Sequence, residues 1–190
     1  MSGMASAQVL GSTLFGALLL AACAAPRPYG EGVGLHTLFS GGYRAVTHDD
    51  FDGHAVYGLE LVTREPESGW GYELGASYGT EDAGGARAHS AEFEQFSFGL
   101  RRSWQPEGSS ARPYLAFGGA REVIEQRLHA PRAEFDERGG AAYVRGGVLW
   151  DLGRYAFDRG TEVVVGVDVR GQAGDDQDSV QLALVLGFGR

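Results

Sequence analysis

His89, Ser90 and Glu92 lie within four residues of one another, which makes them the local candidates for hydrolytic chemistry. A hydroxyl nucleophile needs a histidine to accept its proton and a carboxylate to orient the imidazole. The trio gives the residue types, but one short segment does not establish their geometry. We therefore expect no catalytic residue and keep an enzyme as the alternative.

Acidic side chains gather in three further places that could attract a hard cation such as Ca²⁺ or Mg²⁺, which prefers several oxygen ligands. The clusters contain His48, Asp49, Asp50 and Asp52; Glu81 and Asp82; and Asp175, Asp176 and Asp178. They lack the ligand spacing and turn glycine of a calcium loop. We predict solvated loop charge, with no metal and no cofactor.

These residues belong to segments in which large apolar and small or polar residues alternate, the period expected of β-strands. Eight such stretches cover residues 33–45, 54–63, 70–80, 91–104, 113–123, 141–152, 161–170 and 179–188. Most have the length that a tilted strand needs to cross a bilayer, and eight is an even number. The sequence predicts an all-β fold, an eight-stranded antiparallel up-and-down barrel over residues 33–190.

Alternation alone does not say which face points inward, so the position of the aromatic residues decides. If the chain enters at the periplasmic end, Trp70, Trp104 and Trp150 share one rim, and Tyr43, Tyr57 and Tyr78 lie toward the other. Two aromatic belts are typical of a protein that meets both surfaces of a membrane. We therefore predict that the apolar face contacts lipid.

The opposite face must then fill a narrow interior with charged side chains. They are Glu60, Glu73, Arg101, Arg145, Asp168 and Arg170, with His36 and Arg44 on the first strand. Unpaired buried charges are costly, so we predict a paired network that fills the barrel. A path for protons or ions is the alternative.

The connections differ in length between the two ends of the expected barrel. Residues 64–69, 105–112 and 153–160 form short connections at the periplasmic end, whereas residues 122–140 form the longest loop at the outer end. Outer-membrane barrels have this asymmetry.

The N-terminus has the features of an export signal. Its apolar run is too short for a transmembrane helix and ends in Leu20-Ala21-Ala22-Cys23, which resembles the lipobox of bacterial lipoproteins. We expect residues 1–22 to be a signal peptide, Cys23 to be acylated, and residues 23–32 to form a linker.

Composition agrees with one domain outside the nucleic-acid-binding classes. The chain has 190 residues, 31 glycines and a net charge of −9. Without a basic stripe it cannot displace counterions from phosphates, so we expect no nucleic acid partner.

Together these features make residues 33–190 similar to the small outer-membrane barrels: the OmpA transmembrane domain, OmpX and the opacity-type proteins. The resemblance implies a non-enzymatic role in surface interaction or envelope structure, in the outer membrane of a Gram-negative cell. It implies contact with outer-membrane lipids and, near Arg121, with lipopolysaccharide. Phe188, third from the end, would be read by the barrel-assembly machinery. The extracellular partner is not implied.

Two alternatives remain open. One is a lipid-A-modifying barrel enzyme, although residues 89–92 lack the His-x-Ser-Asn pattern of the deacylases. The other is a periplasmic, lipocalin-like lipoprotein with a lipophilic ligand.

Overall fold

The computed structural model describes residues 34–47, 53–65, 68–83, 89–129, 132–155, 161–174 and 178–189. The predicted signal peptide, linker and Cys23 lie outside these ranges, as do residues 48–52 and 175–177 of the acidic clusters. Within the described ranges, no helix is long and apolar enough to cross a membrane.

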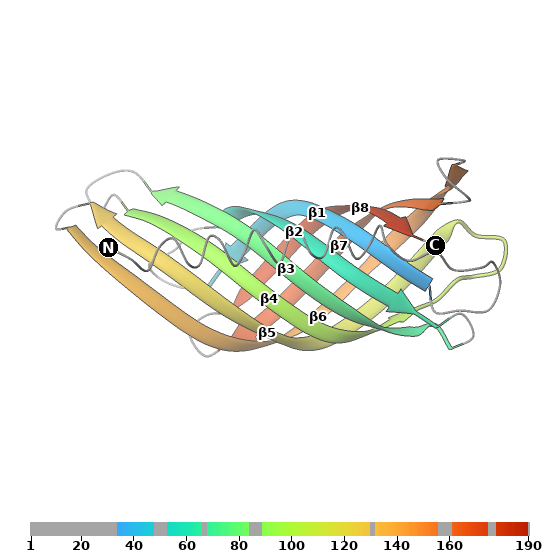
Figure 1. Cartoon of the computed structure of the whole chain (residues 1–190), viewed down its shortest axis with the longest axis horizontal. Coiled ribbons are helices and arrows are strands. Elements are labelled where there is room, and N and C mark those ends of the chain that lie inside the picture. Colours follow the sequence, from blue (N-terminus) through green and yellow to red (C-terminus); the bar gives the residue numbers. More distant parts are fainter. Residues whose placement is uncertain are drawn as a thin grey trace.

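Eight antiparallel strands form one closed barrel in which each strand pairs with its neighbour in sequence and β8 pairs with β1 (Figure 1). The strands are β1 (Gly34–Val46), β2 (His54–Arg64), β3 (Trp70–Ala83), β4 (His89–Ser103), β5 (Ala111–His129), β6 (Arg132–Tyr155), β7 (Thr161–Gly174) and β8 (Ser179–Gly189). The predicted fold class is confirmed.

The register sets the width of the barrel. We start at His36 and step from each residue to its register partner on the next strand. After one full turn around the barrel the path returns to β1 at Val46, ten residues further along the strand. With eight strands, this stagger corresponds to strands tilted by about 40° and to an interior just wide enough for side chains to fill. Residues that point inward must therefore contact one another.

The two ends of the barrel differ in shape. We call the end where β1 begins and β8 ends the terminal rim, and the opposite end the far rim. At the terminal rim, Glu65 and Trp70 close the turn between β2 and β3 with a backbone hydrogen bond of 2.8 Å. Gly69 in this turn has a φ of 70°, which other residues rarely adopt. The turn fixes the start of β3.

At the far rim, the expected long loop at residues 122–140 is wrong. β5 continues to His129, β6 begins at Arg132, and the two strands pair as far as His129 and Arg132. The strands continue beyond the apolar band, where the outward positions of β5 are no longer apolar, as at Arg121 and Glu125. The sequence pattern therefore ended before the strands did.

The chain beyond the far rim forms a one-sided extension, which we call the protruding sheet: residues 80–83 of β3, 89–94 of β4, 122–129 of β5 and 132–140 of β6. These segments remain paired with each other, whereas β6 pairs with β7 only from Ala141 onward. The long strands are visible at the left of Figure 1. Within the described residues, one edge of β6 at 132–140 is therefore without a strand partner.

The faces are arranged as predicted for a membrane barrel. Leu182 and Leu184 on β8 are 60% and 70% exposed, and Val167 on β7 is 38% exposed. Glu73 and Arg145 are each 4% exposed. The structure therefore has its apolar residues outside and its charges inside, the inverse of a water-soluble barrel.

Candidate functional site

The interior charges form the most elaborate polar arrangement in the described part of the chain. We call six of them the central network; all are buried and come from β2, β3, β4, β6 and β7. They are Glu60, Glu73, Arg101, Arg145, Asp168 and Arg170. Three carboxylates face three guanidinium groups, so their formal charges cancel within the interior.

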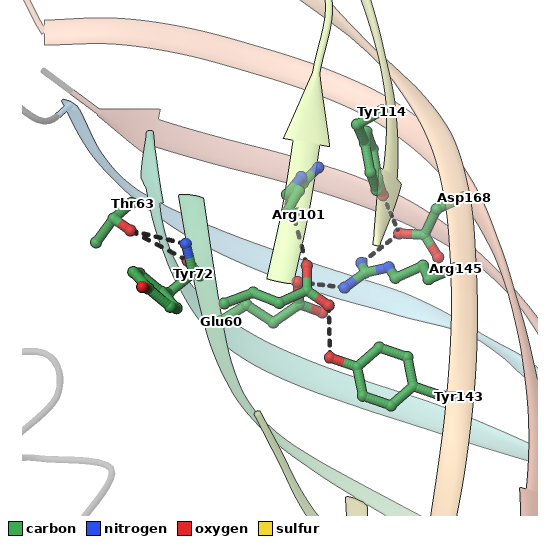
Figure 2. A network of polar contacts seen from close by, with 9 residues as sticks. Glu60, Thr63, Tyr72, Arg101, Tyr114, Tyr143, Arg145 and Asp168 are labelled. Carbon is green, nitrogen blue, oxygen red and sulfur yellow. Dashed lines mark hydrogen bonds and ion pairs between the residues drawn. The ribbon is translucent and has the colours of Figure 1, made fainter. Parts of the chain in front are cut away.

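Arg145 joins two sides of this network. Its guanidinium donates to Glu60 on β2 and to Asp168 on β7, and Tyr114 donates to the same carboxylate over 3.1 Å (Figure 2). Both carboxylates are almost entirely shielded from solvent, since Glu60 is 9% exposed and Asp168 is 2% exposed. Without Arg145 they would lack this positively charged partner. One guanidinium is thus shared by two carboxylates from separate strands, with charge-assisted hydrogen bonds to both.

Two tyrosines complete the network. Tyr143 donates to Glu73 over 2.7 Å, and Glu73 forms a longer ion pair of 3.8 Å with Arg101. Arg101 also stacks 3.4 Å from the Tyr114 ring centre, and Arg170 lies 4.0 Å from that of Tyr143. Such contacts stabilise a guanidinium that has few water molecules around it.

Glycines make room for these large inward side chains. A Cβ atom at Gly99 would lie 2.2 Å from the Tyr143 hydroxyl, and one at Gly147 would lie 2.8 Å from both Asp168 and the Tyr114 hydroxyl. Alternating glycine with charge along neighbouring strands is therefore the local sequence feature that allows the network to fit.

A second cluster, the terminal network, closes the interior near the terminal rim. Arg112 donates to Glu162 over 2.8 and 3.3 Å and lies 3.9 Å from Asp151. His36 lies 2.7 Å from the same Glu162 carboxylate. His36 was in the predicted set, whereas Glu162 and Arg112 were missed because they lie at the ends of strands, beside the expected turns.

A third cluster, the far network, lies near the far rim. Arg44 forms a two-point contact with Glu122, and its Nε donates to Ser179 over 3.0 Å. Gln95 donates to Gln172 over 2.7 Å. Glu122 was missed because it was assigned to a loop. The expected strand at residues 113–123 already contained it, and its alternation with the exposed Arg121 would have placed it inside.

An apolar cluster separates the central network from the terminal network. Its members are Leu38, Val62, Tyr114, Leu149, Val164 and Val185. Leu38 follows His36 by one inward position, and Val164 follows Glu162 in the same way. The interior is therefore a sequence of charged and apolar layers, which resembles a packed core more than an aqueous channel.

The aromatic residues predicted as belts all lie on the outer face and are exposed. At the terminal rim, Trp70 starts β3, Trp104 follows the end of β4, and Trp150 pairs with Ala111 at the start of β5. Toward the far rim, Tyr57 on β2 pairs with Tyr78 on β3. Tyr43 on β1 pairs with Ala55, which lies two residues before Tyr57. The structure thus places the two sets in different zones.

The hydrolytic trio lies at the start of β4, on the protruding sheet. Ser90 and Glu92 alternate with the buried Ala91 and are half-buried, while the side chain of His89 lies outside the described residues. Glu92 pairs with Glu125 of β5. This arrangement sets the carboxylates of Glu92 and Glu125 on neighbouring strands.

The described part of the acidic clusters also offers no metal site. Within it, no group of three His, Cys, Asp or Glu side chains could hold a metal ion. Glu81 is buried inside the barrel end, whereas Asp178 is exposed. The prediction of solvated loop charge is therefore wrong for Glu81, which lies on strand β3 with its side chain turned into the barrel.

No protein-family model matches the chain, and no curated protein matches it significantly. Solved structures do resemble it. The attachment invasion locus protein Ail of Yersinia pestis is 11% identical with a TM-score of 0.59, over 85% of this chain and 100% of Ail. Ail has also been solved with the heparin analogue sucrose octasulfate.

Two further structures match at a TM-score of 0.50. The N-terminal β-barrel domain of Pseudomonas aeruginosa OprF is 16% identical, over 83% of this chain and 97% of that domain. Neisserial surface protein A is 9% identical, over 83% of this chain and 96% of that protein. At these identities the likeness concerns the fold, that of small eight-stranded outer-membrane barrels.

Proposed function

We propose that this chain is an integral, non-enzymatic β-barrel protein of the bacterial outer membrane, with the terminal rim toward the periplasm and the protruding sheet outside. The main support is the exposed apolar band that encircles the barrel. A monomeric water-soluble protein rarely exposes a continuous apolar surface of this extent. The tryptophan and tyrosine zones at the two edges of the band suit the two membrane interfaces.

The filled interior favours a role at the surface over transport. The charged layers and the apolar cluster occupy the cross-section of a barrel that is just wide enough for side chains. The activity of such a protein lies in what its exposed parts contact. This chain accordingly serves surface interaction or envelope structure.

The protruding sheet is the part best placed for a surface contact. Its β6 edge at residues 132–140 has backbone groups without a strand partner among the described residues, and an edge of this kind can pair with an extended segment of another chain. The chain is acidic, with a net charge of −9. A sulfated polyanion of the kind solved with Ail therefore suits this surface poorly, and a neutral or basic partner suits it better.

Insertion in a bilayer tests the main proposal. The full chain, refolded with phospholipid vesicles, should migrate differently on a gel before and after heating. Lipids brominated near the carbonyl should quench its tryptophans more than lipids brominated deep in the chain, because the three tryptophans lie at the rim. A chain that stays soluble and unquenched would favour the lipocalin-like carrier instead.

The surface role has its own test. Removing residues 126–135 and joining the ends with a two-residue Asn-Gly turn should leave the heat-dependent migration intact, because the paired strands within the apolar band are untouched. Binding of the intact protein to host-cell or bacterial surfaces should fall. A shortened protein that binds as well as the intact one would favour the structural role.

We also propose that the protein does not modify lipid A and that Cys23 is acylated. Overexpression should leave the acyl chains of lipid A unchanged. A change abolished by His89→Ala would establish the enzymatic alternative.

Acylation of Cys23 predicts that mass spectrometry of the mature N-terminus finds a lipid-modified cysteine.

A further inference from the structure

One charged residue lies on the otherwise apolar outer face at the terminal rim. Arg102 is exposed on β4, and Trp70 on β3 is its register partner. Trp104 follows on the same face two residues later. The other outward-facing strand residues that the structure describes at this rim are uncharged.

The two tryptophans hold the guanidinium group. Its central carbon lies 5.3 Å from the Trp70 ring centre and 5.7 Å from that of Trp104. Both distances are within the range of a cation–π contact. Trp70 is fixed by the tight Gly69 turn, and the backbone N–H of Trp104 donates to the Pro113 carbonyl over 2.9 Å. We call Trp70, Arg102 and Trp104 the rim clamp.

The rim clamp leaves the donors of Arg102 unused. A ring face interacts with the charge of a guanidinium but does not accept its five N–H groups in the plane. Within the described residues, no carboxylate lies within ion-pair distance of Arg102. Arg112, inside the barrel at the same end, pairs instead with Glu162.

The position of Arg102 indicates what would accept these donors. Its side chain starts two residues nearer the middle of the strand than Trp104, and a long arginine side chain on a lipid-facing surface extends toward the headgroups. A phosphodiester is an acceptor that a guanidinium contacts at two points. If the terminal rim faces the periplasm, the headgroups at this level belong to phospholipids.

We propose that the rim clamp binds the headgroup phosphate of an anionic phospholipid in the periplasmic leaflet. This inference rests on the proposed membrane location. Trp70 and Trp104 hold the guanidinium at the level of the phosphate, and Arg102 donates to the phosphate oxygens. The contact would fix the height of the barrel in the bilayer at one point of its circumference.

The test counts lipids bound to the full chain, refolded in detergent micelles and titrated with phosphatidylglycerol, by native mass spectrometry. Arg102→Gln should weaken the tightest lipid adduct by about fivefold, the loss expected for one charge-assisted contact at an exposed site. Arg102→Lys should be intermediate, since it keeps the charge but loses two-point contact. Arg138→Gln is the matched control, because Arg138 is exposed on β6 in the protruding sheet, away from the terminal rim.

Each outcome has a defined meaning. Equal binding by Arg102→Gln and the unaltered chain would overturn the inference, as would an equal loss in Arg138→Gln, which would indicate a non-specific charge effect. Full competition by millimolar inorganic phosphate would also overturn it, since the site would then be a general phosphate site. Heat-dependent migration in vesicles, measured on the same variants, reports the membrane location separately.

Discussion

Replacing Arg145 tests whether the central network holds the barrel together. Arg145→Met keeps most of the side-chain volume and removes the charge that Glu60 and Asp168 share. Both carboxylates then remain buried without that cation. Breaking a buried ion pair from one side costs about 3–5 kcal/mol, because an uncompensated charge stays behind. The expected loss in the free energy of unfolding is therefore about 3–5 kcal/mol.

The assay is urea unfolding of the full chain in phosphatidylcholine vesicles at pH 7, followed by tryptophan fluorescence and by heat-dependent migration. The three tryptophans lie on the outer face at the terminal rim and report the loss of the membrane-inserted barrel. Arg121→Met is the control for the same chemical change at an exposed position. It should cost less than about 1 kcal/mol.

The double variant Glu60→Met with Arg145→Met separates two explanations. If the cost of Arg145→Met comes from the uncompensated charge of Glu60, removing Glu60 as well should recover part of the stability, because a buried pair can be replaced by apolar groups at little cost. Losses below about 1 kcal/mol for Arg145→Met, or strictly additive losses in the double variant, would refute the reasoning.

Two further comparisons address packing and lipid exposure. Gly99→Ala should destabilise the barrel by about 1–3 kcal/mol, because its Cβ would displace the Tyr143 hydroxyl, whereas Gly119→Ala, whose nearest neighbour is 3.8 Å away, should be neutral in the same urea assay; equal effects would contradict the packing argument. Leu184→Arg, in the middle of β8, should lower vesicle stability by about 2–4 kcal/mol, and Val180→Arg, near the far rim, by about 1 kcal/mol or less; a reversed order would contradict the lipid-facing assignment.

The fold could be predicted because a membrane barrel repeats one local rule. Each strand alternates between lipid and interior, so Leu182, Leu184 and Leu186 indicate their own face without knowledge of the rest of the chain. The rule stops working in the protruding sheet, because its outward positions are no longer apolar: Arg121 and Glu125 alternate with the buried Glu122 and Ile124. Residues 122–140 were taken as a loop for that reason, and Glu122 was lost from the interior with them.

The charged residues of the central network could be predicted, but not their partners. Arg145 and Asp168 lie on neighbouring strands, yet Glu60 is contributed from across the barrel. Pairing across the interior depends on the stagger of ten residues, which is a property of the closed barrel. No single strand encodes it, so the terminal and far networks emerged only from the structure.

The hydropathy of the whole chain conceals the apolar outer band of the barrel. Mean hydropathy is −0.19, the value of an ordinary water-soluble domain. A barrel exposes only alternate residues to lipid, so each apolar residue is offset in the average by an inward neighbour such as Glu73 or Asp168. The inward charges therefore do two things at once. They fill an interior too narrow for water-filled transport, and they keep the strands from becoming continuous apolar runs that would aggregate before insertion.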